Sequence, residues 1–148
     1  MNKGLPNNID AEKSLIGSMF WSKASLQKGC EDVEPDFFYL ERNAIIFATI
    51  KTLYNRHDPV DVNTVTTELV DRNLLNQVGG VEYLSEIINS VATGANIEYY
   101  INSVAEKYTL RRPRNFTEAV SALMIILLNK SFVKIFYEYF IKFPRERV

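Results

Sequence analysis

The 148-residue sequence is poor in the residues on which most catalytic and metal sites depend. It contains one cysteine, Cys30, and one histidine, His57. A single cysteine excludes an intramolecular disulfide and a thiolate metal cluster, so we expect a small buried or half-buried thiol in a protein of the reducing cytoplasm. A lone histidine could act as a catalytic base only beside a nucleophile and an orienting carboxylate, and we recognise no such set. Because His57 lies within RHDP, we interpret it as an exposed turn residue.

Long apolar runs and an excess of charge of one sign are also missing. The longest uninterrupted apolar stretch, residues 122–128, is far shorter than the roughly 20 residues that a membrane-spanning helix needs. The first residues contain no apolar signal core. A net charge of -1 gives no basic footprint for nucleic acid. The sequence therefore predicts a cytoplasmic protein with no membrane partner and no DNA contact of its own.

Glycine is scarce too, and the one adjacent pair, Gly79 and Gly80, stands directly before a helix-like run. A phosphate-binding loop would need G-x-x-x-x-G-K-[ST], or G-x-G-x-x-G after a buried strand, and the sequence contains neither pattern. Glu82 and Glu86 follow the pair and would repel a phosphate. We therefore predict a turn between two helices rather than a nucleotide site, and we expect no cofactor or metal in this chain.

Helical periodicity dominates what is present, and strict apolar/polar alternation is rare. We expect an all-α fold with a compact multi-helix head over residues 1–112. Asn8 or Asp10 is expected to cap the first helix and Asp61 the fourth. The segments with apolar residues at intervals of three and four are 10–21, 24–28, 41–56, 61–73, the run from the glycine pair to 91, and 97–108.

Three aromatic residues follow the EPD that separates the second and third expected helices. We expect Phe37, Phe38 and Tyr39 to pack in the core, because large aromatic side chains are usually buried in a protein of this size.

The composition changes after Arg112. Residues 113–148 carry six basic and three acidic side chains, a net +3, whereas residues 1–112 carry a net -4. Two apolar stripes, separated by NKS at 129–131, predict an antiparallel helical hairpin. Residues 122–128 are apolar on nearly every side of a helix, so they need a cover beyond the hairpin mate, and a second subunit would supply it. The alternative is a divergent, truncated or out-of-frame C-terminus.

Five segments together carry a family resemblance: PNNIDAEKSLIGSMF, EPDFFYLERNAIIFATIKTLY, PVDVNTVTTEL, LLNQVGGVEYLSEI and ATGANIEYYINSVAEKYTLRR. In order and spacing they resemble the N-terminal domain of bacterial replicative DNA helicases of the DnaB type, over about residues 5–112. The resemblance implies a helical head followed by a helical hairpin, and hairpins that pair subunits into the dimers of a hexamer's collar. It also implies that primase docks on this collar, with a helicase loader as a further partner.

The same resemblance assigns ATP hydrolysis and DNA translocation to a separate C-terminal RecA-like domain. ATP and magnesium would therefore bind there, this chain would be catalytically silent, and DNA would be bound only through the full-length helicase. A free-standing, truncated helicase-like regulator that binds a helicase or its loader is the alternative. An interfacial membrane hairpin is a third reading of the basic, aromatic tail, and Glu118 and Glu138 count against a spanning segment.

The candidates for partner or subunit contacts are large apolar and aromatic side chains. Most belong to the expected hairpin, and some of those must pack within one subunit. Tyr83 lies at the edge of an apolar helix stripe, where a tyrosine at the rim of the core is an equal alternative. The candidates are Tyr83, Phe116, Val120, Leu123, Leu127, Phe132, Ile135 and Phe136.

Overall fold

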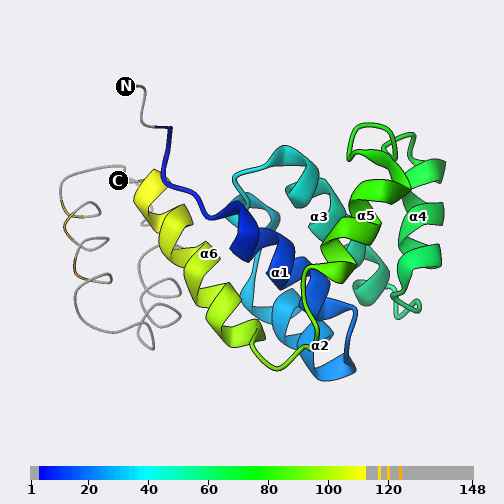
Figure 1. Cartoon of the computed structure of the whole chain (residues 1–148), viewed down its shortest axis with the longest axis horizontal. Helices are drawn as coiled ribbons and strands as arrows, with labels where there is room; N and C mark the ends of the chain where they lie inside the picture. Colours follow the sequence, from blue (N-terminus) through cyan, green and yellow to red (C-terminus); the bar gives the residue numbers. More distant parts are fainter. Residues whose placement is uncertain (1–3, 113–116, 118–119, 121–123, 125–148) are drawn as a thin grey trace, which may run out of the picture.

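The computed structural model describes residues 4–112 together with Thr117, Val120 and Met124 (Figure 1). Within these residues the chain is helical and contains no strand, so the all-α prediction is confirmed. Apart from these three residues, the predicted hairpin over 113–148 lies outside the described residues. The elements are α1 (Ile9–Met19), α2 (Lys23–Asp32), the 3₁₀ turn η1 (Pro35–Phe37), α3 (Glu41–Asn55), α4 (Val62–Asp71), α5 (Gly80–Asn89) and α6 (Ile97–Arg111).

Short polar side chains set the starts of three helices. The side chain of Asn8, not that of Asp10, accepts a hydrogen bond from the Ala11 N–H and begins α1. Asp61 caps α4, as the sequence predicts, and the structure adds a reciprocal capping box with Thr64. Ser22 caps α2, so this helix begins at Lys23 and is longer than the expected 24–28.

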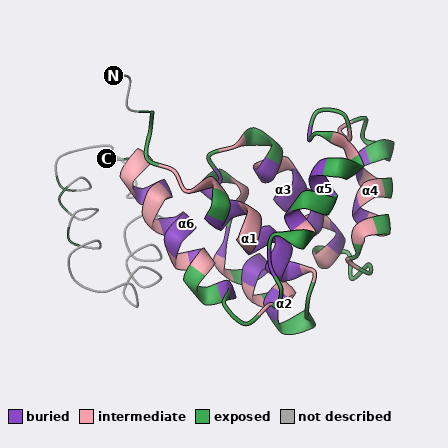
Figure 2. Cartoon of the chain, in the orientation of Figure 1, coloured by how far each residue is buried: buried purple, intermediate pink, exposed green. Residues whose placement is uncertain are grey.

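Helix α1 occupies the centre of the molecule. It packs against α6, α5, α2 and α3, while α4 packs on α3 at the end of the molecule opposite α6 (Figure 1). Leu15 and Ile16 are completely buried, and Figure 2 shows the buried residues on the inward sides of the helices. Gly17 allows the close approach of α5, since a Cβ there would lie 2.5 Å from the carbonyl oxygen of Ile87.

The glycine pair forms the predicted turn. Gly79 and Gly80 have φ angles of +99° and +74°, a left-handed conformation that favours glycine. The N–H of Gly80 donates to the carbonyl of Leu75 at 2.9 Å, and the chain then enters α5. His57 is exposed in the turn after α3, also as predicted.

Two further expectations concern buried side chains. Cys30 is buried, as predicted, and burial raises the pKa of its thiol from 9.0 to about 11. Phe37 and Phe38 are buried, but the prediction for Tyr39 is wrong, because 39% of it is exposed. The Tyr39 N–H is bound to Glu12 and its ring faces Arg111 at the surface. No helix in the described part of the chain has both the length and the apolar character that crossing a membrane requires.

Candidate functional site

A buried carboxylate connects α1 to the start of α3. Glu12 is only 1% exposed, and its oxygens accept hydrogen bonds from the N–H groups of Tyr39 at 2.6 Å and Leu40 at 3.4 Å. Leu40 is the N-cap residue of α3 and offers no capping side chain of its own. Glu12 therefore supplies, from another helix, the acceptor that the start of α3 needs.

The network continues through Asn43 to Tyr83 on α5. The Asn43 amide donates to Glu12 at 2.9 Å, and its Oδ1 accepts the Tyr83 hydroxyl at 2.7 Å. Asn43 is completely buried and Tyr83 is 5% exposed. Burial raises the pKa of the Tyr83 hydroxyl. Tyr83 therefore links α3 to α5, which corresponds to the core-rim interpretation of this residue.

Two cations cover the Tyr83 ring at the surface. The guanidinium carbon of Arg42 lies 3.8 Å from the ring centroid, and the Lys13 ammonium lies 5.5 Å from it. Lys13 also forms an ion pair with Glu86, and this hydrogen bond raises the pKa of Lys13 and lowers that of Glu86. A partner that approached Tyr83 would therefore meet Arg42, Lys13 and Glu86 before the phenol ring.

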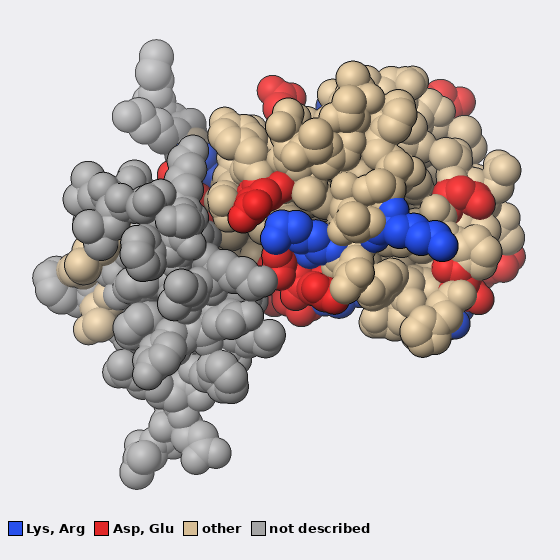
Figure 3. Space-filling model, turned by 90° about the horizontal axis from the view of Figure 1, so that it is seen from below, with Lys and Arg blue, Asp and Glu red and all other residues tan. Residues whose placement is uncertain are grey.

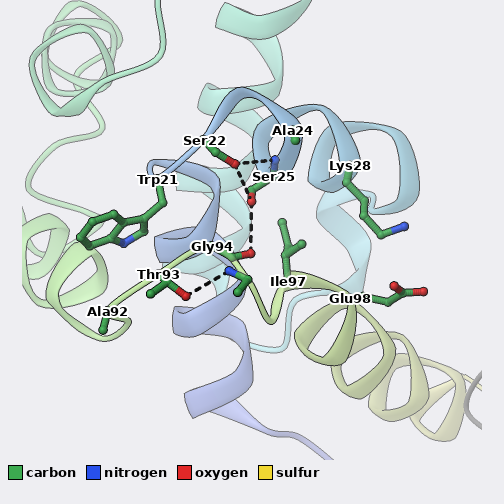
Figure 4. A pocket seen from close by; sticks show the side chains of 11 residues that line it. Trp21, Ser22, Ala24, Ser25, Lys28, Ala92, Thr93, Gly94, Ile97 and Glu98 are labelled. Carbon is green, nitrogen blue, oxygen red and sulfur yellow. Dashed lines mark hydrogen bonds between the residues drawn. The ribbon is translucent and has the colours of Figure 1, made fainter.

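An open groove of about 650 Å³ lies between the start of α2 and the loop from α5 to α6 (Figure 4). Trp21, the only tryptophan of the chain, is 52% exposed at one side, and Lys28 and Glu98 lie on the other. The hydroxyl of Ser25 donates to the carbonyl of Gly94 at 3.2 Å across the floor. No sequence pattern predicted this groove, although the single tryptophan at the end of the first expected helix was a usable signal.

The other interface candidates belong to the expected hairpin, and Val120 is the one among them that the structure describes. Val120 is 37% exposed and Met124 45%, and with the exposed Thr117 they occupy positions i, i+3 and i+7 of helical residues. This spacing places them on one face. Phe116, Leu123, Leu127, Phe132, Ile135 and Phe136 lie outside the described residues.

The charged side chains do not make a single-sign surface in the view of Figure 3. There, Lys and Arg form a band across the face, with Asp and Glu on both sides of it. Among the described residues, no group of three His, Cys, Asp or Glu side chains could hold a metal ion.

Comparison with known proteins gives the family of this fold. The family model of the DnaB-like helicase N-terminal domain matches residues 4–106. The replicative DNA helicase DnaC of Bacillus subtilis is 45% identical over 107 residues, which are 72% of this chain and 24% of that helicase. The replicative DNA helicase DnaB of Geobacillus stearothermophilus is 41% identical over 107 residues, again 72% of this chain and 24% of that helicase. The matched part thus spans about a quarter of the length of these relatives.

A solved structure agrees with this result. The crystal structure of the N-terminal domain of DnaB helicase from Mycobacterium tuberculosis superposes with a TM-score of 0.71 at 35% sequence identity. The superposition covers 82% of this chain and 81% of that one. The resemblance found in the five sequence segments is therefore confirmed, and this chain belongs to the family of DnaB-like helicase N-terminal domains.

Proposed function

We propose that this chain acts as the N-terminal collar domain of a hexameric replicative DNA helicase in the bacterial cytoplasm. Its task is assembly and the docking of primase, while ATP-driven unwinding belongs to a C-terminal RecA-like domain that is not in this sequence. The observation that carries the proposal is the family match over residues 4–106, which covers nearly the whole described head.

The described surface supports an assembly role. Val120 and Met124 expose apolar side chains on one helical face immediately after the head, and a second copy of the chain would remove this face from water. Primase is the proposed docking partner, and a helicase loader is a further one. DNA would be contacted only through the complete helicase, which fits the mixed charge of the described face.

The assembly role is tested by light scattering across a concentration series. We expect a dimer or a larger ring that dissociates on dilution. The double variant Val120→Glu, Met124→Glu should shift the population to monomers, because two buried charges would oppose the contact. Val70→Glu is the matched control, since Val70 is an exposed valine on α4, 51% accessible, and its replacement should leave assembly unchanged. A wild-type chain that remains monomeric at all concentrations would contradict the proposal.

The docking role is tested with a chimera. Residues 1–112 of this chain would replace the corresponding segment of the Bacillus subtilis helicase, with which this chain is 45% identical. We expect the chimera to form hexamers, to unwind DNA with ATP and to bind Bacillus subtilis primase. Hexamers that unwind DNA but do not bind primase would refute docking and leave assembly intact.

A further inference from the structure

Three parts of the chain that are far apart in sequence meet where α6 ends. They are the N-terminal segment at residues 5–8, the corner at residues 37–40, and the last turn of α6. Tyr108 of α6 stacks on Phe37 with ring centroids 4.7 Å apart and an interplanar angle of 11°. Asn8 donates from Nδ2 to the Ser103 hydroxyl at 3.0 Å. Helix α6 is therefore held against both other parts.

Arg111 binds both of these parts at once. Its Nη1 donates to the Pro6 carbonyl at 3.0 Å, and its Nη2 donates to the Phe37 carbonyl at 2.5 Å. The guanidinium carbon also lies 5.6 Å from the centroid of the Tyr39 ring. Partial burial lowers the pKa of Arg111, and the charge of Glu12 acts in the opposite direction. One planar side chain thus bridges two backbone carbonyls and one ring.

The corner at residues 37–40, to which Arg111 donates a hydrogen bond, is also bound by Glu12 of α1. Glu12 accepts the N–H groups of Tyr39 and Leu40, while Arg111 takes the carbonyl of Phe37 in the same corner. Glu12 is buried in α1, the central helix of the head. Arg111 therefore binds to a corner that cannot move without breaking its hydrogen bonds to the buried Glu12 carboxylate.

We propose that Arg111 is a positioning residue for subunit assembly, which fixes the direction in which the chain leaves the head after Arg112. The inference rests on the proposed assembly function, because direction matters only if the following residues meet a second subunit. A chain that leaves in many directions would be competent to assemble for only part of the time. Because both subunits of a dimer must be competent, the apparent dissociation constant would rise by the inverse square of that fraction.

Two variants and one control separate this role from a loss of charge. Arg111→Ala removes all three contacts. Arg111→Lys keeps the charge, but an ammonium lacks the planar fork that reaches two carbonyls in different directions. Arg72→Ala is the control, because Arg72 is an ion-paired arginine at the end of α4 whose loss changes the net charge equally.

The direction of the chain after Arg112 is measured as the distance between two spin labels. Spin labels are placed at Ser85→Cys on α5 and at Thr117→Cys, both exposed positions, in a Cys30→Ala background. The labelled full chain is diluted with unlabelled chain, so that only distances within one subunit are recorded. We expect a narrow distribution for the wild type and the control, and a broader or shifted one for Arg111→Ala and Arg111→Lys. A broad wild-type distribution, or one that neither variant changes, would overturn the proposal.

Assembly is measured separately by sedimentation of the same chains. We expect the dimer dissociation constant to rise about tenfold in both variants, as for a competent fraction of about one third in each of the two subunits. The helical circular dichroism signal and the melting temperature of both variants should stay close to those of Arg72→Ala. If Arg111→Ala lowers the melting temperature, the test uses Arg111→Lys and a chain that begins at Asn7 instead, since each removes only some of the contacts of Arg111. A weaker dimer at an unchanged melting temperature would then support the positioning role, and an unchanged dimer would contradict it. A monomeric wild type would refute the proposed function. The spin-label distances would still test whether Arg111 fixes the direction of the chain after Arg112.

Discussion

The hydroxyl of Tyr83 donates a 2.7 Å hydrogen bond to the side-chain oxygen of Asn43, which lies 40 residues earlier in the chain. Asn43 is completely buried, and its amide donates onward to Glu12. The hydrogen bond joins α5 to α3, and through Glu12 both helices are joined to α1. The surface around Tyr83 is therefore built on a polar network inside the head.

Replacing Tyr83 by phenylalanine tests this connection. Tyr83→Phe leaves the buried oxygen of Asn43 without its donor, so we expect the free energy of unfolding to fall by about 1–3 kcal/mol. The measurement is urea denaturation followed by circular dichroism. Tyr99→Phe is the matched control, because Tyr99 is 58% exposed, and it should change stability by less than about 0.5 kcal/mol. Equal effects of the two variants would show that the Tyr83 hydroxyl does not stabilise the fold.

Glu12 should matter more than any other carboxylate of α1. Glu12→Ala leaves the start of α3 without its acceptor and leaves the Asn43 amide unpaired, so we expect a loss of about 3 kcal/mol. Glu12→Gln keeps one acceptor oxygen and should lose less. Glu41→Gln, at an exposed position in the first turn of α3, is the control. Hydrogen exchange at Tyr39 and Leu40 should accelerate in the Glu12 variants and remain slow in the control.

Gly17 offers a test in which packing opposes helix propensity. Alanine usually stabilises a helix by about 1 kcal/mol over glycine. At Gly17 the added Cβ would lie 2.5 Å from the Ile87 backbone oxygen, so α1 and α5 would have to separate. We expect Gly17→Ala to lower the melting temperature by several degrees, as for a loss of about 1–3 kcal/mol. Gly4→Ala, where a Cβ meets nothing within 4 Å, should be neutral, and a stabilised Gly17→Ala would refute the close packing.

Cys30 gives a prediction about pH. Its pKa is raised by burial from 9.0 to about 11, so the folded state binds the thiol proton more tightly than the unfolded state does. The corresponding stability is fully present below pH 9 and should be lost as the pH rises from about 9 to about 11. Cys30→Ala should show a smaller loss over this interval. The wild-type thiol should also react slowly with a thiol reagent at pH 8 until urea unfolds the chain, and rapid reaction of the folded protein would contradict its burial.

Local features of this protein were predictable from the sequence because each depends on residues close together in the chain. Apolar intervals of three and four residues located the helices, Asp61 marked the start of α4, and the glycine pair marked a turn. The five segments also identified the family, which the comparisons confirmed.

Other features were decided only by the packing of distant segments. Glu12 occupies the first turn of α1, where an acidic residue would ordinarily face water. It is nevertheless buried, and its carboxylate oxygens accept the N–H groups at the start of α3. Tyr39 follows two buried phenylalanines and is nevertheless exposed beside Arg111. The groove beside Trp21 likewise exists only where α2 meets the loop before α6.

The division between the two sets has one physical cause. Helix starts, turns and apolar stripes are determined by hydrogen bonds and side-chain spacing within a few residues, so the sequence by itself determined them. The partners of Glu12, Tyr83 and Arg111 lie 27 to 105 residues away, and no local pattern specifies them. Only the packing of α1 against α3, α5 and α6 decided which polar groups meet, because each buried donor or acceptor must find its partner in the completed core.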